Sequence, residues 1–115
     1  MTLSKHFKRS EFACFCGCGF DTVDVVLLEA LEAIREHFGK PVSITSSARC
    51  DKHNSLVGGA QKSQHKKGRA ADIVVNETSP DVVADFAEDL GLSVGRYNYF
   101  THIDSRSGPP ARWSA

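Results

Sequence analysis

Apolar residues recur at helical spacing in residues 21–41, where they are three or four positions apart and would line one buried face. These residues are Leu27, Leu31, Ile34 and Phe38. Asp21 or Thr22 can cap the start of this helix, because both side chains accept hydrogen bonds from free backbone N–H groups. Gly39 ends it. The pattern therefore predicts a long amphipathic helix near the start of the chain.

A second helix is predicted within residues 79–92. Ser79 is a suitable cap, Pro80 suits the first helical position, and Gly91 suits the position just past the end. We expect its buried face to contain Val82, Val83, Phe86 and Leu90.

Three segments alternate between apolar and polar positions, or are short and β-branched, and predict strands. They are residues 42–47, residues 69–76, and residues 93–105, the last read as two strands joined near Asn98. In the second segment the alternation places Asp72 on the face opposite to Ile73. In the last segment it places His102 and Asp104 on one face.

The remaining segments are predicted to be irregular. Residues 1–20 form an arm with a short helical turn at residues 8–12, residues 48–68 form a polar loop, and the C-terminal tail is extended. The order of elements indicates a single α+β domain over residues 1–115. We expect a small, mostly antiparallel sheet with helices packed on one face and an open cleft on the other.

Charge and hydropathy exclude two classes of partner. Fourteen basic and fourteen acidic residues cancel, whereas nucleic-acid-binding domains usually carry a basic face. No apolar run approaches the ~20 residues that cross a bilayer, so membrane insertion is not expected. The one local basic excess is Lys62, Lys66, Lys67 and Arg69, which either forms a solvated loop or attracts an anionic substrate.

The first residues contain no apolar stretch that could serve in a secretory signal peptide. We therefore expect a protein that is cytoplasmic when made, or that is exported without a signal of its own. The expected oligomeric state is a monomer.

Four cysteines lie at positions 14, 16, 18 and 50, and the first three are spaced more tightly than the usual C-x-x-C of a zinc knuckle. Two alternatives stay open. Disulfides could tie the arm to Cys50, or, in a reducing compartment, the cysteines remain thiols or hold a structural metal. In either case we expect them to tether the N-terminal arm and not to take part in catalysis.

His65, Asp72 and His102 have the chemistry of a catalytic zinc site, which uses three protein ligands and leaves one position open. Asp72 stands in an apolar strand, where a carboxylate is costly unless it is paired or bound to a metal. Spacing alone does not decide the matter. A strand histidine is more often structural, and Asp72 could simply pair with Arg49 or Arg69.

A resemblance strengthens the metal interpretation. The stretch "SQHKKGRAADI" resembles the S-x-H-x-x-G-x-A-x-D signature of the zinc D-Ala-D-Ala carboxypeptidases and phage peptidoglycan endopeptidases, whose hedgehog/DD-peptidase fold is shared with hedgehog signalling domains. "ITSSARC", "FTHID", the start "HFKRSEFAC" and the end "RYNYF…ARW" also resemble the small single-domain branch. The similarity covers nearly the whole chain.

The resemblance implies that His65, Asp72 and His102 bind Zn²⁺, that Arg49 holds a substrate carboxylate or carbonyl or stabilises an oxyanion, and that Ser63 contacts the substrate. It implies metal-assisted hydrolysis of amide bonds in peptidoglycan peptides, performed at the bacterial cell wall after release or export.

One position departs from the family pattern. Many relatives have a glutamate base three residues before the last zinc histidine, and this chain has Tyr99 there. We assign the base to Asp104, whose alternative role is to orient His102, and assign to Tyr97 a role in steadying the intermediate. Trp113 either covers the cleft or fills an edge of the core, and we favour the core. The missing glutamate leaves open an alternative function, a weakly active or inactive zinc-stabilised module of a phage or of a cell-wall assembly.

Overall fold

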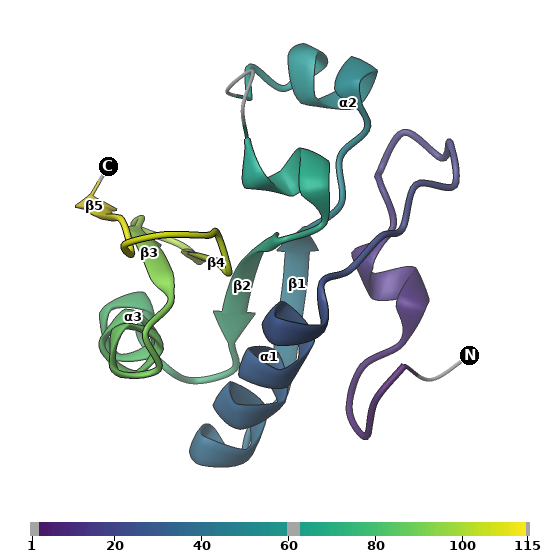
Figure 1. Cartoon of the computed structure of the whole chain (residues 1–115). Helices are drawn as coiled ribbons and strands as arrows, with labels where there is room; N and C mark the ends of the chain where they lie inside the picture. Colours follow the sequence, from purple (N-terminus) through teal and green to yellow (C-terminus); the bar gives the residue numbers. More distant parts are fainter. Residues whose placement is uncertain (1–2, 60–62, 115) are drawn as a thin grey trace.

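The computed structural model describes residues 3–59 and 63–114, within which five strands form one sheet in the order β1-β2-β4-β3-β5 (Figure 1). The strands are β1 (Val42–Ser46), β2 (Ala70–Val75), β3 (Ser93–Arg96), β4 (Thr101–Asp104) and β5 (Arg112–Ser114). The helices are η1 (Arg9–Phe12), α1 (Val25–Phe38), α2 (Asp51–Leu56), η2 (Gln64–Lys67) and α3 (Pro80–Asp89). The α+β prediction is confirmed. Lys62 of the basic cluster lies outside the described residues.

The sheet is mixed, since β5 runs parallel to β3 while the other pairings of the described strands are antiparallel. The predicted extended tail therefore becomes an edge strand. A bulge interrupts β1 between Ile44 and Ser46, opposite Asp72 of β2. Bulges bend a strand and redirect the side chains that follow, and here the chain leaves β1 toward the cleft described below.

Helices α1 and α3 contact each other and β2, and they cover one face of the sheet (Figure 1). Alternate residues of the strands point into this layer, including Ala71 and Ile73 of β2, Val94 of β3 and Ile103 of β4, all of which are buried. The arrangement leaves the opposite sides of β2 and β4 available for polar residues.

Helix α1 begins later than predicted. Its cap is Asp24, whose side chain accepts a hydrogen bond from the Leu27 backbone N–H, so the prediction of Asp21 or Thr22 was wrong. The helix ends as predicted at Gly39, which adopts a left-handed conformation. The sequence offers three capping side chains in a row of four residues, and tertiary contacts select among them. Asp24 also donates its backbone N–H to the Gly68 carbonyl and accepts a bond from the Ser105 hydroxyl.

The predicted buried face of α3 was partly wrong. Val83, Ala84 and Ala87 are buried, whereas Val82 and Leu90 are 49% and 40% exposed. Helical periodicity gives the spacing of a stripe but not its position around the helix. The two alanines sit on the sheet side, where small side chains allow close approach. The predicted cap Ser79 and first residue Pro80 are confirmed.

The segment predicted as a loop contains two short helices, α2 and η2. Each starts at a side chain that accepts a hydrogen bond from a backbone N–H group. The Cys50 sulfur accepts from the His53 N–H, and the Ser63 hydroxyl oxygen accepts from the His65 N–H. Both helices are too short to show hydrophobic periodicity, and the glycines and charges of the segment dominate its pattern. Their presence gives His65 and Arg49 defined positions.

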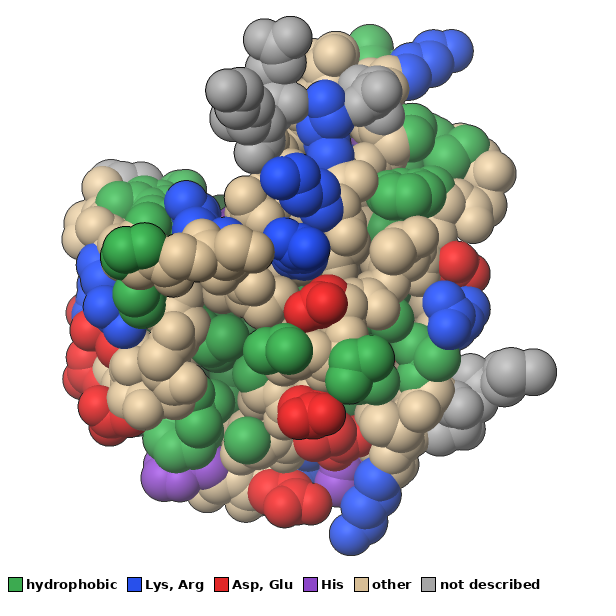
Figure 2. All heavy atoms as spheres, viewed as in Figure 1, with side chains coloured by type: hydrophobic (Ala, Val, Ile, Leu, Met, Phe, Trp, Pro, Cys, Tyr) green, Lys and Arg blue, Asp and Glu red, His purple; other side chains and the backbone are tan. Residues whose placement is uncertain are grey.

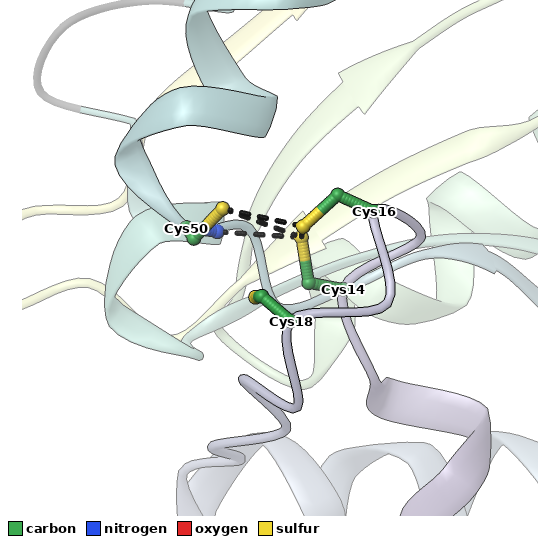
Figure 3. Close-up of side chains that lie close together, drawn as sticks. All are labelled: Cys14, Cys16, Cys18 and Cys50. Atoms are coloured by element: carbon green, nitrogen blue, oxygen red, sulfur yellow. Dashed lines mark hydrogen bonds between the residues drawn. The ribbon is translucent and has the colours of Figure 1, made fainter.

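The N-terminal arm packs against the rest of the molecule through Phe7 and Phe12, which are buried. The Glu32 carboxylate of α1 accepts hydrogen bonds from the Ser4 hydroxyl and the His6 backbone N–H. The thiols of Cys14, Cys16 and Cys18 come together with that of Cys50 (Figure 3). Among the described helices, none has both the length and the apolar character to cross a bilayer.

Candidate metal centre and active-site cleft

The surface is hollowed into a cavity of about 430 Å³ on the side of the sheet that the helices leave free. Figure 2 shows a notch between two lobes of the molecule, with Lys and Arg side chains gathered around it. The described lining residues are Arg49, Gly58, Gly59, Ser63, Gln64, His65, Asp72, Tyr97, Phe100, His102, Arg106 and Trp113.

Asp72 and His102 meet because they are directly opposite each other on neighbouring antiparallel strands. Side chains at such positions lie on the same face of the sheet and within contact distance. The Nδ1 atom of His102 is 2.9 Å from Oδ1 of Asp72. Both residues belong to the layer that alternates with the core residues Ala71 and Ile103, as the alternation in the sequence predicted.

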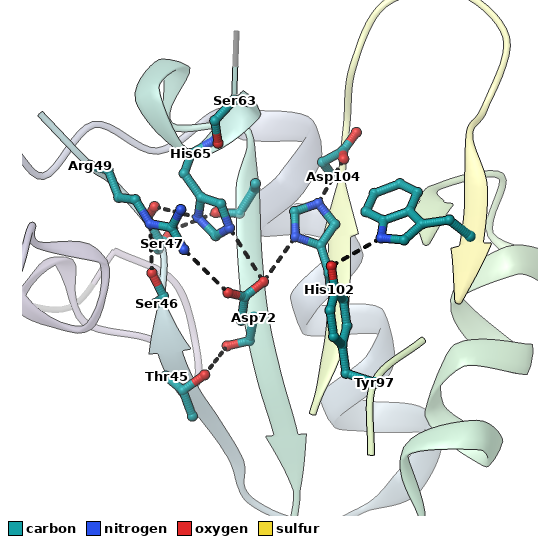
Figure 4. A network of polar contacts seen from close by, with 12 residues as sticks. Thr45, Ser46, Ser47, Arg49, Ser63, His65, Asp72, Tyr97, His102 and Asp104 are labelled. Carbon is teal, nitrogen blue, oxygen red and sulfur yellow. Dashed lines mark hydrogen bonds and ion pairs between the residues drawn. The ribbon is translucent and has the colours of Figure 1, made fainter. Parts of the chain in front are cut away.

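His65 reaches the same point from η2 (Figure 4). Its Nδ1 lies 2.7 Å from the Ser47 carbonyl oxygen, which only accepts, so Nδ1 carries the ring proton. Nε2 is then left with its lone pair, and it lies 3.3 Å from Oδ1 of Asp72. A hydrogen bond from the second ring nitrogen is the usual way in which proteins orient a histidine ligand.

The structure thus brings His65, Asp72 and His102 together, with one potential ligand atom from each lying within 4.8 Å of the others. Two imidazole nitrogens and one carboxylate oxygen, at the wall of an open cavity, fit a zinc ion that keeps its fourth position for water or substrate. All three residues are at least nine-tenths buried. Because the cavity beside these three side chains is open, it leaves room for a fourth ligand. The donor set therefore suits a catalytic ion better than a fully enclosed structural one.

The electrostatics of the cluster hold Asp72 ionised. Burial would raise the pKa of Asp72, but its contacts with the His102 and His65 rings outweigh this effect and lower the pKa to about 2. Burial likewise disfavours the charged form of His102, yet its contacts with Asp104 and Asp72 raise the pKa of His102 above the ordinary value. A metal ion at this position would therefore compete with a proton for Nδ1 of His102.

Asp104 contacts the far side of His102, with its Oδ2 2.8 Å from Nε2. Arg106 binds the same carboxylate through two hydrogen bonds. Its Nε donates to Oδ1 at 2.8 Å, and its Nη2 donates to Oδ2 at 2.7 Å. Burial opposes ionisation, but the bonds from Arg106 and His102 place the pKa of Asp104 well below its usual range. Asp104 is fully buried and is not among the lining residues, so its carboxylate faces His102 and not the cavity.

Arg49 follows β1 and enters the cavity beside Asp72, with Nη2 3.6 Å from Oδ2. Its Nε donates to the Ser46 hydroxyl and its Nη1 to the Asn54 side-chain oxygen, at 3.3 and 3.4 Å. The Arg49 backbone N–H donates to the His65 carbonyl, which ties this segment to η2. The guanidinium is thus held next to the candidate metal position.

Tyr97 and Trp113 form the opposite wall. The indole Nε1 of Trp113 donates to the Tyr97 hydroxyl oxygen at 3.0 Å, and the indole ring lies 5.0 Å from the His102 ring between centroids. Trp113 can lie here because Gly95, the strand partner of His102, has no side chain. A Cβ at Gly95 would come within 2.5 Å of the indole ring.

Sequence reasoning missed two members of this site. Trp113 lines the cavity, so of its two predicted places the cleft is correct and the core, which we favoured, is wrong. Arg106 was not singled out, although it lies two residues beyond Asp104, a spacing that allows a charge pair in an extended chain. Ser63 lines the cavity while its hydroxyl caps η2. Tyr99, at the position where the resemblance implied a glutamate, is 86% exposed and does not line this cavity.

Comparison with known proteins agrees with this geometry. The family model described as Peptidase M15 matches residues 5–104. The chain is also 33% identical over 98 residues to a zinc D-Ala-D-Ala carboxypeptidase of Streptomyces albus G, a match that covers 79% of this chain and 38% of that relative. The chain thus spans well under half the length of this relative. Because the family model covers most of the chain, this protein belongs to the peptidase M15 family.

Proposed function

We propose that the protein is a zinc peptidase that hydrolyses peptide bonds in peptidoglycan stem peptides, acting at the bacterial cell wall as a D-Ala-D-Ala carboxypeptidase or as an endopeptidase. The observation that carries the proposal is the convergence of His65, Asp72 and His102 at the wall of an open cavity. Membership of the peptidase family and the carboxypeptidase activity named for the Streptomyces relative support the reaction class.

Zinc held by these three residues would supply Lewis acidity to the scissile carbonyl and would lower the pKa of a water molecule. The chain's own residues orient the substrate. Arg49 is fixed by Ser46 and Asn54, and its planar guanidinium suits a carboxylate or carbonyl oxygen of the peptide. The basic residues around the notch favour an anionic peptide, as the carboxylates of stem peptides require.

We assign Tyr97, which lines the cavity, the role of donating a hydrogen bond to the reacting carbonyl oxygen as negative charge develops on it. The Trp113 N–H already donates to the phenol oxygen, which leaves the phenol proton for a substrate acceptor. We assign Asp104 the role of a positioning residue. Its two oxygens bind Arg106 and orient His102, which leaves it no access to the substrate.

A second candidate function is a zinc-stabilised cell-wall-binding or phage structural module with little activity. One observation favours it: among the described lining residues, no carboxylate other than the ligand Asp72 faces the cavity as a base. The two candidates share the metal site and differ in turnover.

Digestion of purified peptidoglycan, followed by mass analysis of the products, separates these functions. The protein is compared as isolated, after chelation, after zinc is restored, and as the Asp72→Asn variant. A carboxypeptidase removes a terminal residue from stem peptides, whereas an endopeptidase converts cross-linked fragments to monomers. We expect product release that disappears on chelation and returns with zinc.

Sedimentation with peptidoglycan without product release would support the binding module instead. Release that survives chelation, or that Asp72→Asn leaves unchanged, would contradict the metallopeptidase proposal.

A further inference from the structure

The four cysteines form a second cluster that the proposed reaction does not use. Figure 3 shows the side chains of Cys14, Cys16 and Cys50 directing their sulfur atoms toward one another, with Cys18 beside them. The first three cysteines lie in the loop of the N-terminal arm, and Cys50 is the N-cap of α2. Residues far apart in sequence are therefore gathered around one point.

The distances within this cluster suit a metal better than a disulfide. The Sγ of Cys16 lies 3.5 Å from each of the Sγ atoms of Cys14 and Cys50, and these two are 3.8 Å apart. With Cys18 included, all four sulfur atoms lie within 4.8 Å of one another. Zinc–sulfur bonds of about 2.3 Å in a tetrahedral centre place neighbouring sulfurs about 3.8 Å apart. A disulfide would instead single out one pair at about 2.05 Å.

The backbone around the cluster supports the same conclusion. The Cys50 N–H donates to the Cys14 sulfur at 3.5 Å, and the His53 N–H donates to the Cys50 sulfur at 3.4 Å. Such bonds orient sulfur ligands. The Cys14 N–H donates to the Phe20 carbonyl at 2.7 Å, which closes the loop so that three cysteines of a C-x-C-x-C run face one centre. This closure accounts for a spacing tighter than C-x-x-C.

We propose that Cys14, Cys16, Cys18 and Cys50 bind a structural zinc ion as thiolates, separate from the ion of the cleft. Four thiolates in one tetrahedral set are the preferred ligands of structural zinc. Each thiol that binds gives up its proton, and the dication offsets the repulsion among the sulfurs.

The site would link the arm to the segment that carries Arg49. Cys50 follows Arg49 directly, and the Ala48 N–H donates to the Phe12 carbonyl at 3.0 Å on the other side of that residue. A metal at Cys50 would restrain the chain on both flanks of Arg49 while touching none of the cleft residues. Loss of this zinc should therefore lower stability and loosen Arg49 without removing the cleft ion.

The test uses reduced, purified protein loaded with Co²⁺, whose thiolate complexes show an intense sulfur-to-metal charge-transfer band and the visible bands of a tetrahedral ion. We expect this spectrum in the wild type and also in a His65→Ala/His102→Ala variant, where the cleft site is lost. The matched variant Cys16→Ser/Cys18→Ser should lose the charge-transfer band and should contain one zinc ion fewer per chain than the wild type.

Titration of the thiols in the wild type gives a readout that does not depend on how any variant folds. We expect them to react slowly with Ellman's reagent until a chelator is added. Absence of the charge-transfer band, equal reactivity with and without chelator, or a disulfide in the mass of the freshly isolated protein would overturn the proposal. None of these results bears on the cleft, so the two proposals fail separately.

Discussion

At the scale of single residues, the candidate active site depends on which atoms of His102 are engaged. Its Nε2 faces Asp104 and its Nδ1 faces Asp72 and the cavity. The orientation of one imidazole ring is therefore set by a carboxylate that Arg106 holds in place. In this arrangement Nδ1 is the atom that would bind the proposed zinc ion, and Nε2 is the atom that Asp104 orients.

Asp104→Asn should weaken zinc binding at the cleft by about 10- to 100-fold, because the asparagine keeps the shape of the side chain but loses the charge that orients His102. A competition titration with a chromophoric chelator measures this change, and the binding step that disappears in Asp72→Asn identifies the cleft site. Asp89→Asn, at the exposed end of α3, is the control. Unchanged affinity in Asp104→Asn would show that Asp104 does not position His102.

Tyr97→Phe should lower kcat by about 10²- to 10³-fold while zinc content stays the same, because it removes one donor to the developing oxyanion. The measurement is steady-state hydrolysis of a stem peptide with zinc content determined in parallel. Tyr99→Phe alters a tyrosine that is 86% exposed and should have no effect. If both variants turned over at the wild-type rate, Tyr97 would have no part in the reaction.

At the scale of elements, η2 places His65, and its end depends on Gly68. This residue adopts φ +68°, and a Cβ there would lie 2.4 Å from the Thr22 carbonyl oxygen. The glycine thus allows both a left-handed turn and the close approach of the segment that precedes α1.

Gly68→Ala should destabilise the protein by more than Gly39→Ala and should also weaken zinc binding. Gly39 has a similar φ of +63° but open space around it, so its substitution reports the cost of the left-handed conformation alone, about 1–2 kcal/mol. Urea unfolding of the two variants separates the two effects. Equal losses would mean that the contact with Thr22 is unimportant.

The N-terminal arm should contribute stability that depends on pH through Glu32. Burial raises the pKa of Glu32, but bonds from Ser4 and His6 outweigh this and lower it below the ordinary 4.5. A depressed folded-state pKa means that the contribution is complete above pH 4.5 and is lost as the pH falls through the folded-state value.

Glu32→Gln should therefore be less stable than the wild type near neutral pH, and its stability should fall less steeply below pH 4.5. Glu36→Gln, on the exposed side of the same helix, should keep the wild-type slope. Urea unfolding over a pH series gives the slopes. If the free energy of unfolding varied with pH in the same way for the wild type and Glu32→Gln, Glu32 would not contribute pH-dependent stability to the arm.

At the scale of the whole molecule, the fold and the meeting of His65, Asp72 and His102 were largely predictable from the sequence and its resemblance. Zinc binding by these three residues stays a prediction. Long amphipathic helices and alternating strands leave clear patterns in a sequence. Strand alternation predicted that Asp72 and Ile73 lie on opposite faces of the sheet. The resemblance supplied the grouping of His65 with the two strand residues, because spacing cannot say which loops meet in space.

Other features of the site could not be predicted, because they depend on tertiary contacts. The place of Trp113 follows from the parallel pairing of β5 with β3 and from the space at Gly95. The carboxylate of Asp104 is held by hydrogen bonds from Arg106, and no hydrophobic pattern in the sequence points to Arg106. The short helices α2 and η2 begin at local caps that look like ordinary loop residues in a linear sequence.

The most direct test of the central claim is anomalous diffraction at the zinc edge from crystals of the zinc-loaded protein. We predict a peak in the cleft within about 2 Å of Nε2 of His65, a carboxylate oxygen of Asp72 and Nδ1 of His102. Zinc-loaded crystals that show no anomalous peak among these three side chains would contradict the account.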